Sequence, residues 1–332
     1  MAADSATLSN AVKTMYSKEL ELRALPRLVH GRWGKVAQWT GYGTYETRRW
    51  EAFSAITTTL SEGNDPLENA APSITIITLT PNWYGSWITY TDKMTITAYD
   101  PAVAEIVGLF GEQAGLSVDT LIRNALTDAA TKDYSGGATA RTGLDVQNDT
   151  ISFVDLVQNV AQLDANNALP VEGMNYVLVL HPHTVATLLQ DSTFVTLLTR
   201  EGGQGLRSGK LGNILNLSIY VSSNARIYTD AGQNSTEEVY EALFIGRESH
   251  VIAGFSGLFP NLHADNMAGE VRGGMTGQRI NVVDIIVKGL GEAGTGLNPL
   301  NMRGTIGWKL TNAQTVLQST WMRSLEHVND FS

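Results

Sequence analysis

Two histidines flank a proline at His181-Pro182-His183, directly after the apolar run Val177–Leu180. Histidine is a common zinc ligand, and a zinc-bound water can hydrolyse a substrate, so this triplet is the first candidate for chemistry. Residues two apart on a helix lie about 200° apart around its axis, which would keep the two rings from converging on one ion. We therefore expect a strand-to-helix joint, with His181 at the N-cap and Pro182 at the first helical position. A metal-dependent hydrolase that uses His181 and His183 is retained as an alternative.

Three further motifs only approach known catalytic sequences. The stretch "GLGEAG" at 289–294 matches a dinucleotide-binding fingerprint, but Pro299 falls inside the required helix and no acidic residue follows at the spacing that binds ribose. The loop "GGQGLRSGKLG" lacks the first glycine and the final Ser or Thr of a phosphate-binding loop. In "GFSGL", the serine misses the nucleophile-elbow spacing by one position. The sequence thus indicates no catalytic residue, no metal and no cofactor, and we expect a protein that is not an enzyme.

The composition excludes several other classes of site. With no cysteine among 332 residues, the chain can form no disulfide, zinc-thiolate site, iron–sulfur cluster or thiol nucleophile. A net charge of -10 argues against general nucleic-acid binding, which depends on Lys and Arg. No apolar run approaches the roughly 18 residues of a membrane span, and the first twenty residues lack the apolar centre of a secretory signal. We expect no membrane association.

The charge is unevenly distributed along the chain. Between Ala11 and Trp50 there are eight basic residues against three acidic ones. This segment is either a solvated basic arm or an arm that contacts an acidic partner or the acidic body of a neighbouring copy. Its stretch "GRWGKVAQWTGYGTYETRRW" interleaves aromatic and basic residues. Such a pattern suits a stacking surface for single-stranded nucleic acid or a protein–protein contact, and the sequence leaves both open.

The pattern of apolar residues predicts three successive regions. Leucines at helical spacing indicate a helical arm over the first thirty residues. From Arg32 to about Thr97, strands "SITIITLT" and "SWITYTDKMTITAY" alternate with loops such as "LSEGNDP", and five of the seven tryptophans occur here. An elongated, hairpin-like excursion is expected. A long helix should then start at Asp100-Pro101 and end near Ala130, a length of about 45 Å.

The rest of the chain is predicted to be mixed α/β. Ser152 and Asp155 are spaced as a capping box for a helix that ends near Ala165. The strand "YVLVL", a helix through "TVATLLQDSTFVTLL" and the strands "LSIYVSS", "VYEALFIG" and "INVVDIIVKG" follow. The stretch "TIGWKLTNAQTVLQSTWMRSLEHV" fits either a strand or a helix by periodicity.

This order of elements resembles the tailed-bacteriophage major capsid proteins of the Hong Kong 97 type, and most closely the subfamily of phage N-four. The matching stretches include "LRALPRLVHGRWG", "YGSWITYTDKMTITAYDPAVAEIVGLFGEQAGLSVDTLIRNAL", "YVLVLHPHTVATLL" and "NPLNMRGTIGWK". The resemblance implies an α+β fold with five parts. They are an N-terminal arm (1–31), an extended loop with peripheral-domain strands (32–97), the spine helix of the peripheral domain (98–143), an α/β axial domain (144–273) and C-terminal strands that return to the peripheral domain (274–332).

The resemblance also implies function and partners. Copies of such a chain self-assemble into pentamers and hexamers of an icosahedral head around double-stranded DNA that they bind without sequence specificity. Scaffolding and portal proteins guide assembly in the host cytoplasm, and decoration proteins are possible partners. An encapsulin-like compartment is the alternative with the same fold. The residues predicted to contact other subunits are those of the basic arm and of the loop tips: Arg23, Arg27, Arg32, Tyr42, Tyr45, Arg48, Arg49 and Trp50.

Overall fold

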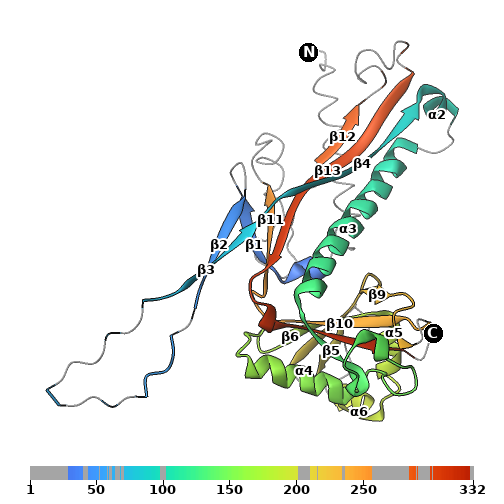
Figure 1. The fold of residues 1–332 in the computed structure, drawn as a ribbon. Helices are drawn as coiled ribbons and strands as arrows, with labels where there is room; N and C mark the ends of the chain where they lie inside the picture. Colours follow the sequence, from blue (N-terminus) through green and yellow to red (C-terminus); the bar gives the residue numbers. More distant parts are fainter. Residues whose placement is uncertain are drawn as a thin grey trace.

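The protein consists of two sheets joined by a long helix, with a narrow ribbon that projects far to one side (Figure 1). The computed structural model describes residues 29–39, 44–51, 53–57, 59, 62–63, 68, 71–97, 102–200, 210–214, 216–233, 236–255, 284–288, 290, 300 and 302–329. The predicted helical arm lies outside these residues except for its last few positions, where His30–Arg32 forms a 3-10 turn, η2.

A five-stranded sheet forms the elongated unit at the top of Figure 1. Its strands are β1 (Lys35–Trp39), β4 (Asn82–Thr91), β11 (His250–Phe255), β12 (Asp284–Lys288) and β13 (Arg303–Val316). The long strand β13 pairs antiparallel with β4, β11 and β12, while β1 pairs parallel with β11. The final stretch, which was ambiguous by periodicity, is therefore a strand where it covers β13.

The long helix α3 (Ala102–Ala129) covers one face of this sheet and confirms the predicted helix. Ile306, Trp308 and Leu310 of β13 alternate along the strand, so their side chains share the face that α3 buries. The Trp308 indole Nε1 donates to Gln113 Oε1 at 3.0 Å, which satisfies its N–H beneath the helix. Among the described elements, no helix covers the opposite face of β4, β12 and β13 (Figure 1).

The second unit is a seven-stranded sheet with helices on one face. Its strand order is β5-β14-β10-β6-β8-β7, with β9 paired to β10. These strands are β5 (Thr131–Tyr134), β6 (Tyr176–Leu180), β7 (Lys210–Ile214), β8 (Leu217–Val221), β9 (Ile227–Tyr228), β10 (Val239–Ile245) and β14 (Met322–Val328), and the helices are α4 (Phe153–Ala165), α5 (Pro182–Leu188) and α6 (Ser192–Arg200).

Strand β6 is apolar throughout because both of its faces are covered. Leu178 and Leu180 pack with residues of α4, α5 and α6, such as Leu156 and Phe194. Val177 and Val179 point the other way, into the cluster that contains the C-terminal half of α3. Every residue of β6 is consequently buried, as is typical of a strand in the middle of a layered α/β unit.

Two predicted elements differ from the structure. The strand "SWITYTDKMTITAY" ends at Thr91, and α2 (Asp92–Thr97) continues as a helix. Met94 N donates to Thr91 Oγ1 and Lys93 N to Asp92 Oδ1, so local capping outweighs the β-branched pattern. The helix predicted through "TVATLLQDSTFVTLL" is two helices, because the Asp191 carboxylate binds Thr193 N and starts α6 anew. The capping box of Ser152 and Asp155 on α4 is confirmed.

The two sheets also divide the chain differently from the predicted ranges at three strands. β5 lies within 98–143, the range assigned to the spine helix of the peripheral domain, but pairs in the seven-stranded sheet. β11 lies within 144–273, the range assigned to the axial domain, but pairs in the five-stranded sheet. β14 lies within 274–332, the range expected to return to the peripheral domain, yet it sits between β5 and β10 in the seven-stranded sheet. Sequence order cannot reveal this exchange, because it depends on long-range pairing.

Among the described residues, no helix has the length and apolar character needed to cross a membrane.

A buried aspartate joins the two units. Asp119 on α3 accepts hydrogen bonds from Val29 N and His30 N at 2.7 Å, lies 2.9 Å from His30 Nδ1, and accepts from Asn224 Nδ2 at 2.8 Å. Burial alone would raise the pKa of this carboxyl, but the His30 and Asn224 hydrogen bonds hold it below its ordinary value. One side chain thus connects the N-terminal segment, the long helix and the loop after β8.

Replacing Asp119 should destabilise the subunit strongly. In Asp119→Ala, four donor groups at this joint lose their acceptor, and we expect the free energy of unfolding to fall by about 3 kcal/mol, because a buried donor left without a partner costs about 1–3 kcal/mol. Urea denaturation of the full chain measures this. The matched control on the same helix is Asp128→Ala, whose side chain is 64% exposed beside Arg226 and should change stability by no more than about 0.5 kcal/mol. Equal effects of the two variants would contradict the role of Asp119.

Candidate assembly surfaces

The histidine triplet forms a strand-to-helix joint, as predicted. His181 is the N-cap of α5 and its Nδ1 accepts from His183 N at 3.2 Å, with Pro182 in the first turn. The expectation that the two rings stay apart was wrong. His181 has an extended backbone with φ -75° and ψ 149°, so helical spacing does not apply, and the ring centroids lie 4.7 Å apart, edge to face.

Neither histidine is arranged for metal chemistry. His181 uses Nδ1 to cap the helix, and burial, followed by repulsion from His183, lowers its pKa. His183 Nδ1 lies 2.9 Å from the hydroxyl of Tyr240, which donates to Glu238. Across the described part of the chain, no group of three or more potential ligands could hold a metal ion. The hydrolase alternative therefore has no third ligand among these residues.

The ribbon is the first candidate surface for contacts with other molecules. β2 (Tyr45–Trp50) pairs antiparallel with β3 (Ile74–Leu79) and with no other strand of the described chain. The segment between them, 51–73, is called the extended loop, and those of its residues that the structure describes project away from both sheets (Figure 1). A two-stranded ribbon is marginally stable in water by itself. Exposed apolar side chains lie along it: Trp50, Phe53, Ile56, Ile74 and Ile76.

The base of the ribbon is packed on the five-stranded sheet. Leu79 is buried in a small cluster with Ala37, Val251 and Ala313 of the five-stranded sheet. Beyond this base, Trp50 and Ile56 are 63% and 77% exposed. The ribbon and loop therefore present apolar area that the described part of the subunit does not cover.

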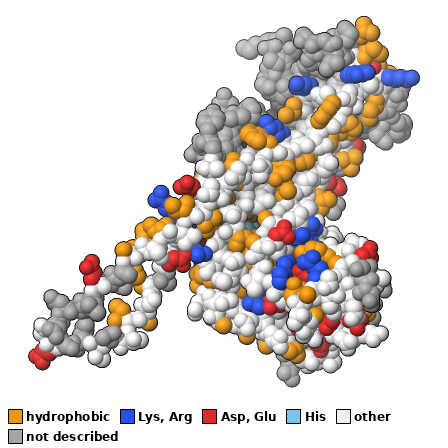
Figure 2. Space-filling model, viewed as in Figure 1, with side chains coloured by type: hydrophobic (Ala, Val, Ile, Leu, Met, Phe, Trp, Pro, Cys, Tyr) orange, Lys and Arg blue, Asp and Glu red, His pale blue; other side chains and the backbone are white. Residues whose placement is uncertain are grey.

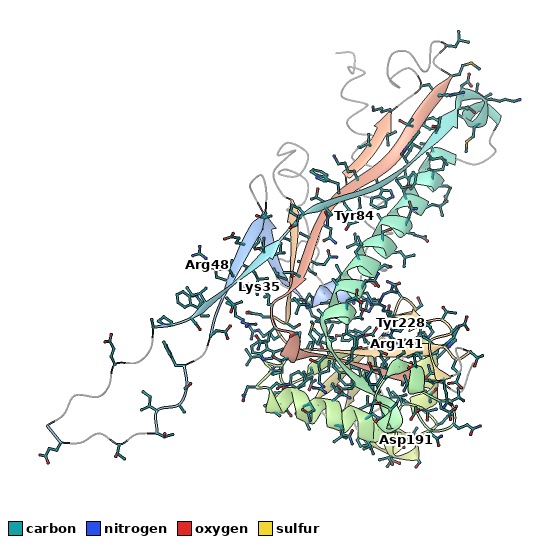
Figure 3. All side chains as sticks on the ribbon, in the orientation of Figure 1. Lys35, Arg48, Tyr84, Arg141, Asp191 and Tyr228 are labelled. Atoms are coloured by element: carbon teal, nitrogen blue, oxygen red, sulfur yellow. The ribbon has the colours of Figure 1, made fainter. Side chains whose placement is uncertain are left out.

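The predicted contact residues fall into three groups. Tyr45, Arg48, Arg49 and Trp50 lie in β2 rather than at the loop tip as expected, because the excursion continues beyond them to residue 73. Arg48 is exposed and extends away from the ribbon (Figure 3), whereas Arg49 bonds its own chain at Leu317 and Gln318. Tyr45 is partly buried at the base, and Arg32 is exposed in η2. Arg23, Arg27 and Tyr42 lie outside the described residues.

The open face of the five-stranded sheet is the second candidate surface. Trp83 and Trp87 of β4 and Ile286 of β12 are 53%, 70% and 45% exposed. They line a shallow groove of about 440 Å³, called the aromatic groove. Figure 2 shows hydrophobic side chains along both this unit and the ribbon. The tryptophan-rich segment is evident in the sequence, but only the pairing of the strands places these two side chains on one face of the sheet.

Two glycines, Gly85 and Gly307, leave space for the groove because they have no side chain. Gly307 lies opposite both Trp87 and Ile286 in the sheet, and Gly85 lies opposite Lys309. A Cβ at Gly307 would lie 2.8 Å from the Trp87 Cβ, and one at Gly85 would lie 2.6 Å from the Trp308 carbonyl oxygen. No larger residue fits at either position without displacing the strand.

A lysine adds charge to the groove. Lys309 Nζ stands 4.0 Å from the Trp83 ring centroid, a cation–π contact that fixes the lysine beside the indole. Contiguous exposed apolar side chains rimmed by polar groups are characteristic of protein–protein contact sites. The groove and the ribbon both have this character.

A cluster of cations on the seven-stranded unit has a different role. The guanidinium carbons of Arg141 and Arg226 lie 3.4 and 4.6 Å from the centroid of the Tyr228 ring. Figure 3 labels Arg141 and Tyr228, and Figure 2 shows Lys and Arg side chains gathered on this unit. Arg141 makes a bidentate pair with Glu326, whose carboxylate is fully buried, and Arg226 pairs with Asp128. Burial by itself raises the pKa of Glu326, but Arg141 and Lys132 hold it below its ordinary value. These cations pair with acidic residues of their own chain, so the cluster stabilises the subunit.

Comparison with known proteins identifies the family. A family model described as phage capsid protein matches residues 75–254, more than half of the chain. This chain belongs to the phage capsid protein family. No curated protein matches the sequence of this capsid protein.

Solved structures of phage capsids share the fold of this capsid protein. "Capsid of Ralstonia phage GP4" is 16% identical with a TM-score of 0.64, covering 89% of this chain and 87% of the other. "Cyanophage Pam1 capsid asymmetric unit" is 12% identical with a TM-score of 0.61, covering 93% of each chain. "Capsid structure of the Cyanophage P-SCSP1u" is 14% identical with a TM-score of 0.60, covering 91% and 89%. The α+β, Hong Kong 97-type fold is thereby confirmed, and the virion is where the capsid protein resides.

Two buried histidines should make the stability of this capsid protein depend on pH. Burial lowers the pKa of His250 and of His327 to about 4, against 6.5 when exposed. Between these values the unfolded chain binds more protons, so the free energy of unfolding should fall as the pH drops from 6.5 towards 4. Urea denaturation at pH 7 and pH 5 measures this loss.

Replacing a histidine distinguishes its contribution to the pH dependence of stability from that of the carboxylates, which also titrate. His250→Gln removes one of the two groups and should reduce the loss of stability between pH 7 and pH 5. Met174→Gln, at a side chain that is 81% exposed, is the control, because it removes no titratable group and should leave the loss unchanged. A pH dependence that is the same in all three proteins would show that His250 does not contribute.

Proposed function

We propose that this chain is a major capsid protein that self-assembles into the pentamers and hexamers of an icosahedral head around double-stranded DNA. The observation that carries the proposal is the ribbon with its extended loop, whose exposed apolar side chains are not covered by any described residue of their own chain. Membership of the phage capsid protein family supports it. Its role is structural rather than enzymatic. The same proposal includes assembly in the host cytoplasm with scaffolding and portal proteins, and membership of the N-four-like subfamily.

The two candidate surfaces complement each other. The extended loop, 51–73, contains four acidic residues and neither Lys nor Arg. The aromatic groove is flanked by Lys288 and Lys309 and lined by Trp83 and Trp87. The loop of one copy, with Phe53 and Ile56, therefore suits the groove of another in both charge and apolar character. This pairing joins identical subunits head to tail, as a closed ring requires.

The direct test is negative-stain electron microscopy of the expressed full-length protein. We expect closed shells, or rings of five and six subunits, at concentrations where sedimentation shows assembly. A discrete monomer under all conditions would refute the proposal. An encapsulin-like compartment, the alternative with the same fold, predicts shells that enclose protein cargo, whereas a phage head requires portal and terminase genes beside this one.

Truncating the groove should impair assembly without unfolding the subunit. In the double variant Trp83→Ala and Trp87→Ala, two largely exposed side chains are lost, so the thermal midpoint should change little. Their loss from a subunit contact should weaken it by about 2 kcal/mol or more, since buried tryptophans are typical hot spots. Sedimentation velocity measures the assembled fraction. Met174→Ala, at a side chain that is 81% exposed in the other unit, is the control, and equal assembly of both variants would exclude the groove.

Charge reversal tests the ribbon separately. Arg48→Glu changes an exposed side chain that extends away from the subunit (Figure 3). We expect normal folding but fewer or malformed shells. Arg48 is proposed to contact the acidic body of a neighbouring subunit, so a glutamate at this position would place two negative charges together and weaken the contact. Circular dichroism reports folding and electron microscopy reports shells. Unchanged shells in Arg48→Glu would remove this residue from the proposed contacts.

A further inference from the structure

Arg49, next to the exposed Arg48, is bound at every donor nitrogen to its own chain. Its Nη1 donates to the Leu317 carbonyl oxygen at 2.6 Å and to Gln318 Oε1. Its Nε and Nη2 donate to Glu51 Oε1 at 3.1 and 2.7 Å. The guanidinium therefore connects the root of the extended loop with a segment 268 positions later.

The loop side of this contact is itself fixed. Glu51 is the first residue of the extended loop, and its Oε1 also accepts from Thr75 Oγ1 at 2.8 Å. Thr75 lies opposite Arg49 in the ribbon. The hydrogen bond from Arg49 lowers the pKa of Glu51 from its ordinary value. Both strands of the ribbon are thus tied to one guanidinium where the loop leaves them.

The other side of the contact is the place where the chain passes between the two sheets. Leu317 and Gln318 begin the connection from β13 to β14, and both backbone N–H groups donate to the Ser249 carbonyl oxygen, at 2.8 and 3.0 Å. Ser249 belongs to the connection from β10 to β11, and Gly246 N of the same connection donates to Trp321 O at 2.9 Å. These two connections, 246–249 and 317–321, lie side by side and are called the crossover.

We propose that Arg49 is a positioning residue that couples the direction of the extended loop to the angle between the two sheets. Any change of that angle moves the crossover, and the guanidinium carries the movement to the root of the loop. Arginine suits this task because its rigid fork donates in several directions at once, whereas a lysine ammonium is a flexible point charge. The coupling stands on the geometry of the subunit, and only its consequence for shells depends on the proposed function.

The absence of cysteine from the sequence allows a direct test. Spin labels at Ile56→Cys in the loop and Val154→Cys on α4, both exposed positions, report the direction of the loop by double electron–electron resonance. A second pair, Met94→Cys on α2 and Val154→Cys, reports the angle between the sheets. Dilution of labelled chains with unlabelled chains removes distances between subunits.

With Arg49 intact, we expect one narrow distance distribution for each pair. Arg49→Ala should abolish the single maximum for both pairs, Arg49→Lys should not restore it, and Arg48→Ala should leave both distributions unchanged. Circular dichroism and the thermal midpoint show whether each variant is folded. Unchanged distributions in folded Arg49→Ala would overturn the proposal, and so would a change confined to the loop pair, because the sheets would then be uncoupled from the loop. Microscopy of the same samples tests shell formation independently, so failure of the coupling and failure of the proposed function are distinguishable.

Discussion

The buried carboxylate of Asp119 is the constraint on which the rest of this structure depends. It sits on the long helix at the height where the helix leaves one sheet for the other, and it binds backbone N–H groups of the N-terminal segment and a side chain of the loop after β8. A buried charge is tolerated only when hydrogen bonds replace its water. The donors come from segments far apart in sequence, so these segments must meet at one point.

A second contact at the same joint acts with Asp119. Trp33 packs on Tyr220 with ring centroids 4.8 Å apart, and Trp33 Nε1 and the Tyr220 hydroxyl both donate to Glu172. The N-terminal segment is therefore held by α3 on one side and by the seven-stranded unit on the other. A rigid joint of this kind lets the exposed ribbon and the aromatic groove keep a defined relation to the body that supports them.

Local chemistry could be predicted from the sequence, and long-range pairing could not. The capping box at Ser152 and the proline at the start of α5 act over three or four residues, so their types and spacing were sufficient. The helix α2 was missed because two side chains, Thr91 and Asp92, outweigh a β-branched pattern. The resemblance to a capsid family supplied the overall architecture, which periodicity alone did not contain.

The candidate surfaces show the same limit. Tryptophan and arginine side chains were predicted to make contacts by residue type, but the exposure of Trp83 and Trp87 depends on which face α3 covers. Arg48 and Arg49 are indistinguishable in sequence, and only strand alternation separates an outward side chain from one that reaches Leu317. Residue type indicates the kind of interaction, and the pairing of strands decides the partner.

The position of β14 has a consequence for the order of events during synthesis. This strand lies between β5 and β10 in the seven-stranded sheet, but it follows all strands of the five-stranded sheet along the chain. The sheet therefore stays open until residues 322–328 have left the ribosome, and pairing over such sequence separations is slow. A nascent chain exposes its ribbon long before the body that carries it is complete. Until β14 has emerged, a nascent chain has no finished seven-stranded sheet to offer to a growing assembly.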